Sequence, residues 1–104
     1  MVSSADLIHR IDAMVTGLSD LLGNPGLPSS EYKSLDGFRA SLQDLQGRLL
    51  QRQFDENSKK YQVAISQLDD AQKKLNQALE AVQKTAQVLE ILGQVVTALE
   101  PLVV

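Results

Sequence analysis

Histidine, cysteine and paired carboxylates are the residues that most often do chemistry in proteins, and this sequence holds few of them. His9 is the only histidine, and the chain has no cysteine. Asp6 and Asp12 each lie three residues from His9, so on a helix the three side chains would share one surface. A metal site needs further ligands, and a catalytic triad needs a nucleophile beside the histidine. Because neither pattern is present, His9 is interpreted as a surface histidine.

Two pairs of adjacent carboxylates are no better placed for catalysis. Asp55-Glu56 and Asp69-Asp70 would each point apart on a helix, because neighbouring helical residues do not face one another. The first pair also lacks the glycine and the closing glutamate of a calcium-binding loop. There is no glycine-rich phosphate loop. The sequence therefore predicts no catalytic residues, no cofactor and no metal site, and hence a protein that is not an enzyme.

The composition is that of one soluble globular domain. The 104 residues are 43% hydrophobic and 22% charged, which is too apolar for a disordered chain. A net charge of −3 argues against nucleic acid as a partner, since nucleic-acid binders usually carry a basic field. The N-terminal segment contains Asp6, His9 and Arg10 where a signal peptide needs an uninterrupted apolar core. We therefore expect a cytoplasmic location.

The elements that would position these residues begin with the longest pattern in the chain. From Tyr61 to Val103, every position reached by alternating steps of three and four is apolar or aromatic, except Thr85. A repeat of 3.5 residues is typical of a helix that keeps one face against another helix. No proline interrupts this stretch before Pro101. The pattern predicts one coiled-coil-like helix over about 59–100, roughly 40 residues and 60 Å long.

The apolar face of this predicted helix widens beyond about residue 81. In the first half, large residues alternate with alanines, which favours close approach to one neighbour. In the second half, Val88, Ile91 and Val95 flank the row, so this part needs two or more neighbours. Apolar surface that no neighbour covers usually marks an interface.

Two shorter helices precede the long one. The first is predicted over about 5–22, and a loop rich in proline and glycine follows at 23–30. The second is predicted over about 31–54, with Ser30 as its N-cap. A turn is expected at about 55–58, where four residues of turn or capping type follow one another.

The expected fold is a single all-α domain over residues 1–104. It is an antiparallel helical hairpin or a three-helix bundle with one long C-terminal helix. Two alternatives stay open at this point. The second and third helices are separated by the turn or continuous through it, and the first helix packs back on the hairpin or extends along residues 85–104.

The uncovered apolar surface predicts a non-enzymatic helical interaction protein. Its partner is a second copy, as a homodimer or larger oligomer, or a helical protein that it serves as a subunit, adaptor or inhibitor. The alternative is a membrane-surface protein that inserts its C-terminal amphipathic segment into lipid. That segment is acidic where lipid-binding helices carry lysine or arginine, so a membrane is the less favoured partner. The candidate interface residues are Leu7, Ile11, Val15, Leu18, Val88, Leu89, Ile91, Leu92, Val95, Val96 and Leu99.

Overall fold

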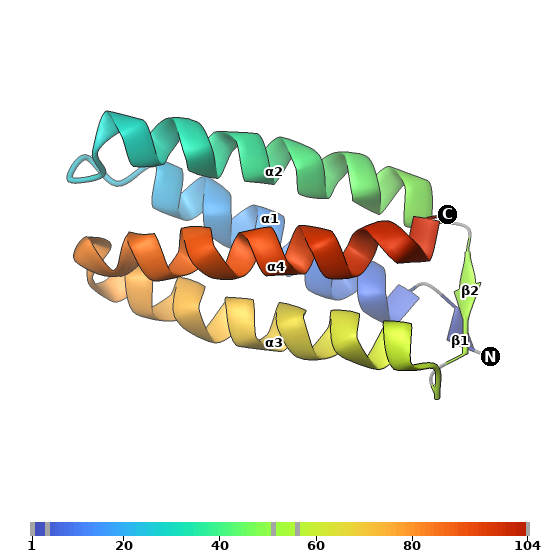
Figure 1. The fold of residues 1–104 in the computed structure, drawn as a ribbon. Helices are drawn as coiled ribbons and strands as arrows, with labels where there is room; N and C mark the ends of the chain where they lie inside the picture. Colours follow the sequence, from blue (N-terminus) through green and yellow to red (C-terminus); the bar gives the residue numbers. More distant parts are fainter. Residues whose placement is uncertain (1, 4, 51, 56, 104) are drawn as a thin grey trace.

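Helices packed side by side along one axis make up the fold (Figure 1). The computed structural model describes residues 2–3, 5–50, 52–55 and 57–103. Within them lie four α-helices, so the all-α prediction is confirmed, and the hairpin or three-helix bundle is corrected to a four-helix arrangement. The elements in chain order are β1 (Val2–Ser3), α1 (Ala5–Leu22), α2 (Ser29–Leu49), β2 (Gln53–Phe54), α3 (Lys59–Glu80), the 3-10 helix η1 (Val82–Lys84) and α4 (Thr85–Val103).

Each helix has two neighbours in the bundle. The pairs α1–α2 and α3–α4 are antiparallel hairpins, and the second hairpin packs on the first through the contacts α1–α3 and α2–α4. In these last two pairs the helices run in the same direction (Figure 1). The molecule measures 43 × 20 × 18 Å, as expected for helices of about 20 residues that rise 1.5 Å per residue.

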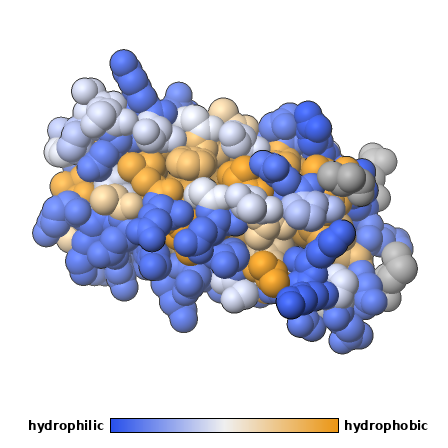
Figure 2. Space-filling model, viewed as in Figure 1, coloured by the Kyte–Doolittle hydropathy of each residue, from blue (hydrophilic) through white to orange (hydrophobic). Residues whose placement is uncertain are grey.

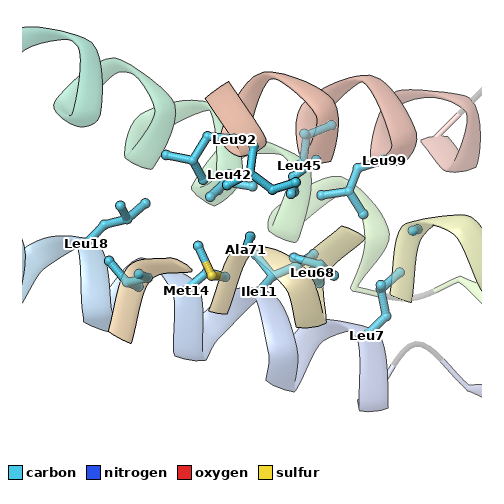
Figure 3. Packing of buried hydrophobic residues seen from close by; sticks show 14 of the residues in the cluster. Leu7, Ile11, Met14, Leu18, Leu42, Leu45, Leu68, Ala71, Leu92 and Leu99 are labelled. Carbon is cyan, nitrogen blue, oxygen red and sulfur yellow. The ribbon is translucent and has the colours of Figure 1, made fainter. Parts of the chain in front are cut away.

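The core is a continuous column of aliphatic side chains contributed by all four helices. Its members recur every three or four residues, which is the spacing that keeps side chains on one helical face. Figure 3 shows this face of α1 turned toward the residues of the other three helices. The first helix therefore packs back on the rest of the chain and does not extend beyond it. The labelled core residues are Leu7, Ile11, Met14, Leu18, Leu42, Leu45, Leu68, Ala71, Leu92 and Leu99.

The second helix is shorter than predicted. The first helix has its expected bounds, whereas α2 ends at Leu49 and not at residue 54. Beyond Leu49 the apolar row of α2 would continue onto charged positions such as Arg52, so a longer helix would bury nothing more. The chain instead forms β2, which pairs antiparallel with β1. This brings Phe54 into the core, where its ring stacks on Tyr61 with centroids 5.7 Å apart.

The turn between the second and third helices is confirmed. The Asn57 backbone N–H donates to Asp55 Oδ1 at 2.9 Å, and the Ser58 N–H donates to the Asp55 carbonyl at the same distance. Residue 56 lies outside the described residues. A continuous helix through this segment, the open alternative, is therefore wrong.

The long C-terminal helix is also wrong as predicted, because the chain folds back at Ala81. This residue has φ −143° and ψ 99°, which ends α3 at Glu80. α4 then begins at Thr85 and runs to Val103, past the predicted end at residue 100. The physical reason is the widened apolar face: folding back covers it with α2 and α3, whereas a straight helix would leave it in water.

The helix N-termini allow a direct comparison between two serines. Ser58 caps α3, since its Oγ accepts a hydrogen bond from the Tyr61 N–H at 3.2 Å. Ser30 is not a cap, contrary to the sequence prediction, because α2 begins at Ser29 after Pro28 and has no side-chain cap. We expect Ser58→Ala to lower the free energy of unfolding by about 1 kcal/mol in urea denaturation, and Ser30→Ala to leave it nearly unchanged. Equal losses for both variants would contradict these assignments.

Candidate functional site: a groove between parallel helices

Most of the predicted interface residues lie in the core of the single chain. Val15, Leu89 and Val96 are half-buried. The rows of α1 and α4 thus face one common interior and are turned away from any partner of the folded chain. Association through these rows remains a prediction, and it would require the bundle to open. The fully or nearly buried residues of the set are Leu7, Ile11, Leu18, Val88, Ile91, Leu92, Val95 and Leu99.

The charged residues near His9 form an ion-pair cluster that joins two helices. Arg10 pairs with Asp6 on the same helix, and its Nε lies 3.0 Å from Asp69 Oδ1 on α3. The hydrogen bond to Asp69 is the largest cause that raises the pKa of Arg10, while partial burial opposes it. His9 itself is exposed. Among the described residues, no group of three or more His, Cys, Asp or Glu side chains could hold a metal ion.

The surface hollows along α3 are bordered by charged side chains and have apolar walls. One of about 130 Å³ lies between α1 and α3 and is lined by the Arg10–Asp69 pair, among others. A larger hollow of about 470 Å³ follows the outer face of α3, where Asp69, Asp70 and Lys73 contribute to its lining. Leu68 contributes apolar surface to the smaller hollow, and Ile65 contributes it to the larger one.

The groove between α2 and α4 is larger than the hollow between α1 and α3, and it combines apolar with charged lining residues. It encloses about 380 Å³. Leu45 is 6% exposed and Val96 is half-buried, so both present carbon atoms to the groove. At the end near the C-terminus, Arg52 Nη2 donates to the Val103 carbonyl at 2.8 Å. The lining residues are Ser41, Asp44, Leu45, Arg48, Val96, Glu100 and Val103.

Small residues continue this groove toward the other end of the bundle. Gly37 lies four residues before Ser41, and Gly93 lies three residues before Val96, so each belongs to the same helical row as a lining residue. A Cβ atom added at either glycine would meet nothing within 4 Å. Leu89, half-buried and four residues before Gly93, extends the apolar floor. We call the whole surface, from Gly37 and Leu89 to Arg48 and Val103, the α2–α4 groove.

The α2–α4 groove lies on the face of the molecule shown in Figure 2. Hydrophobic surface gathers along the middle of this face, and hydrophilic side chains border it. The sequence did not predict this site. The groove exists because α2 and α4 lie side by side, and no local sequence pattern predicts that pairing. The available signals were Gly37 and Gly93, two glycines inside helices where glycine is unfavourable.

One helical segment among the described residues, Val82–Val103, is long and apolar enough to cross a membrane. Length and composition alone support this, and 33% of its most apolar window is buried inside the bundle. The core helix of a soluble protein meets the same criteria.

Comparison of the chain with protein-family models, with curated proteins and with solved structures finds no match. The groove and the packing of the four helices are therefore the only guides to function.

Proposed function

We propose that this chain is a non-enzymatic helical interaction protein that receives an amphipathic helix of a protein partner in the α2–α4 groove. One observation carries the proposal: an apolar floor, including Leu89 and Val96, lies between two parallel helices beside glycines that leave open space. Apolar grooves between helices commonly bind the apolar face of another helix.

The glycines explain why the partner would be a helix. Helices pack with their axes 8–10 Å apart, and the shorter distances need small residues at the contact. Gly37 and Gly93 provide such positions on both sides of the groove, and Ser41 adds a small polar one. A partner helix of about 20 residues matches the length over which α2 and α4 run together.

Charges at both ends of the groove would help to position the partner. Asp44 and Arg48 form an ion pair on α2, with Arg48 Nε 3.0 Å from Asp44 Oδ2, and Glu100 lies across the groove on α4. Toward the other end, the exposed Glu90 lies three residues before Gly93 on α4. Acidic groups of α4 thus flank the uncharged middle of the groove, which favours a partner helix with basic residues near both ends of its apolar face.

Filling the open space at the glycines tests the proposal. We expect Gly37→Gln and Gly93→Gln each to weaken partner binding at least about tenfold, since one lost close contact costs more than about 1.4 kcal/mol. Neither variant should destabilise the fold, because glutamine favours helices more than glycine does and the space is empty. Gly47→Gln is the matched control, because Gly47 has equally open space but lies outside the groove.

Binding is measured by cross-linking from a photoreactive residue placed at Ser41, with the captured proteins and their linked peptides identified by mass spectrometry. The expected adduct joins Ser41 to a helical segment of one partner and is lost in both groove variants but kept in Gly47→Gln. Adducts that persist unchanged in Gly37→Gln and Gly93→Gln would contradict the groove as the binding site.

A membrane surface is a second candidate partner, favoured by the apolar segment Val82–Val103. Its buried face is packed on α2 and α3, so insertion into lipid would first require α4 to leave the bundle. If the chain is an interaction protein, we expect no co-sedimentation with neutral or anionic phospholipid vesicles. Co-sedimentation together with a loss of protection of the α4 amides from hydrogen exchange would favour the membrane.

A further inference from the structure

The turn between α3 and α4 departs from helical geometry at one residue. Ala81 has φ −143° and ψ 99°, whereas α3 reaches to Glu80 and η1 starts at Val82. The segment from Glu80 to Thr85 contains no glycine and no proline. Turns between antiparallel helices usually use such residues. Every residue of this turn is therefore compatible with a continuous helix.

The hydrogen bonds of the turn are also compatible with a continuous helix. The Ala81 N–H donates to the Gln77 carbonyl at 2.9 Å, which is the bond that a continuous helix would also make. The Lys84 N–H donates to the Ala81 carbonyl, and the Thr85 N–H to Val82, both over three residues. Rotation about the Ala81 backbone would keep the first bond and replace the two three-residue bonds by regular helical bonds over four residues.

The core-facing row also continues through the turn. Its members Ala78, Val82, Thr85, Val88 and Leu92 follow one another at steps of four, three, three and four residues. All are buried except Val82, which is half-buried. A straight helix would keep this row on one face, and that face would need new neighbours.

We propose that two copies of the chain exchange α4. In the exchanged dimer, α3, η1 and α4 join into one helix, and α4 of each copy packs on α2 and α3 of the other. The contacts that bury α4 in one chain are all remade between chains, and only the turn changes conformation. The inference rests on the proposed function in that association occurs between helices, but it names a second copy as partner and does not use the α2–α4 groove.

The end of the bundle at which the exchange would take place is the one that carries the turn. The α1–α2 loop and η1 both lie there (Figure 1), and a Cβ atom at Gly26 would be 3.6 Å from Val82 Cγ1. The joined helix, residues 59–103, would be about 67 Å long, compared with a bundle length of 43 Å. The two bundles would therefore lie end to end with these loops between them.

The protein concentration during refolding determines whether the monomer or the exchanged dimer forms. Within one chain, α4 has an effective concentration in the millimolar range for its own site, because the turn is short. We expect monomers after refolding at about 10 μM and exchanged dimers after refolding at about 1 mM. Once formed, the dimers should persist for hours on dilution, because α4 must leave the core before it can return to its own chain.

A proline at Val82 separates the two forms. Residue 82 is the first position of η1, where proline is favoured, and Ala81 already has the extended backbone that a residue before proline adopts. In the joined helix the same proline would occupy an interior position, where it disrupts the helix strongly. Since a dimer holds two such helices, Val82→Pro should lower the dimerisation constant at least about a thousandfold. Val82→Ala, which also removes the valine side chain but favours the helix, should keep the dimer.

The readout is light scattering after refolding at both concentrations, combined with a distance measurement in the dimer. Spin labels at Lys60→Cys and Glu100→Cys, in a chain diluted with unlabelled protein, report whether α3 and α4 of one chain lie side by side. In the monomer the labels lie at the same end of the bundle, and in the exchanged dimer about 60 Å of helix separates them. The chain has no other cysteine that could be labelled.

Three results would overturn the exchange. They are the absence of dimers at 1 mM, a dimer that Val82→Pro forms as well as the unchanged chain, and a dimer in which the two labels of one chain stay close. The last result would still support association through a surface, and Gly37→Gln would then show whether the α2–α4 groove is that surface. Loss of the groove interaction alone would leave the exchange unaffected.

Discussion

Replacing Leu92 by alanine should lower the free energy of unfolding by about 3 kcal/mol and the melting temperature by roughly 10–20 °C. Leu92 is fully buried on α4 and lies in the column of leucines between the helices (Figure 3). The substitution removes carbon atoms from a site that all four helices enclose, so the structure can close the resulting cavity only in part. Urea denaturation followed by circular dichroism measures the loss.

The same substitution decides what the apolar face of α4 does. A core role predicts that the loss is independent of protein concentration, because the contacts are made within one chain. A role confined to the contact between copies predicts a change in association with little change in the unfolding of the monomer. The control is Leu79→Ala, since Leu79 is 38% exposed on α3 and its truncation should cost under about 1 kcal/mol. Equal losses at the two leucines would contradict the core assignment.

Replacing Gly17 by valine should destabilise the bundle by about 3 kcal/mol or more. Gly17 is buried where α1 meets α3, and a Cβ atom there would overlap the Cδ2 atom of Leu75 and lie 3.3 Å from its Cγ atom. Leu75 is itself fully buried and has no solvent to move into. The two helices would have to separate, which weakens the packing along the whole α1–α3 contact.

Three other helical glycines give the opposite expectation and serve as controls. A Cβ atom at Gly37, Gly47 or Gly93 would meet nothing within 4 Å. Gly47→Ala should therefore raise the free energy of unfolding by about 0.5–1 kcal/mol, because alanine favours the helix. Denaturation curves of Gly17→Val and Gly47→Ala should shift in opposite directions from that of the unchanged chain. A stabilised Gly17→Val would show that α1 and α3 do not approach closely at this position.

The features that could be predicted from the sequence are those that depend on neighbouring residues. The apolar row of α1 repeats at helical spacing and is flanked by a clear break, so its bounds were predicted as 5–22 and confirmed. The apolar faces of α3 and α4 were identified correctly for the same reason. The turn at 55–58 was predicted because residues of turn and capping type follow one another there.

The features that could not be predicted depend on tertiary contacts. Ala81 has no local property that ends a helix, and the chain folds back there because α2 and α3 together cover the wide face of α4. The widening itself was read from the sequence, but as surface for a second molecule. Likewise, no local pattern distinguishes Gly37 and Gly47, which have open space around them, from Gly17, which is a close contact.

The order of the helices makes this a molecule of two consecutive halves. Residues 5–49 form one hairpin and residues 59–103 the other, so each helix has one neighbour in its own half and one in the other half. The halves are joined by the segment from residue 50 to residue 58, which β1 holds by pairing with β2. A chain cut in this segment would keep both hairpins whole and separate only the contacts between them. The bundle can thus be regarded as a pair of complementary fragments. The affinity of the two separate hairpins for one another would measure directly how strongly the contacts between the halves stabilise the fold.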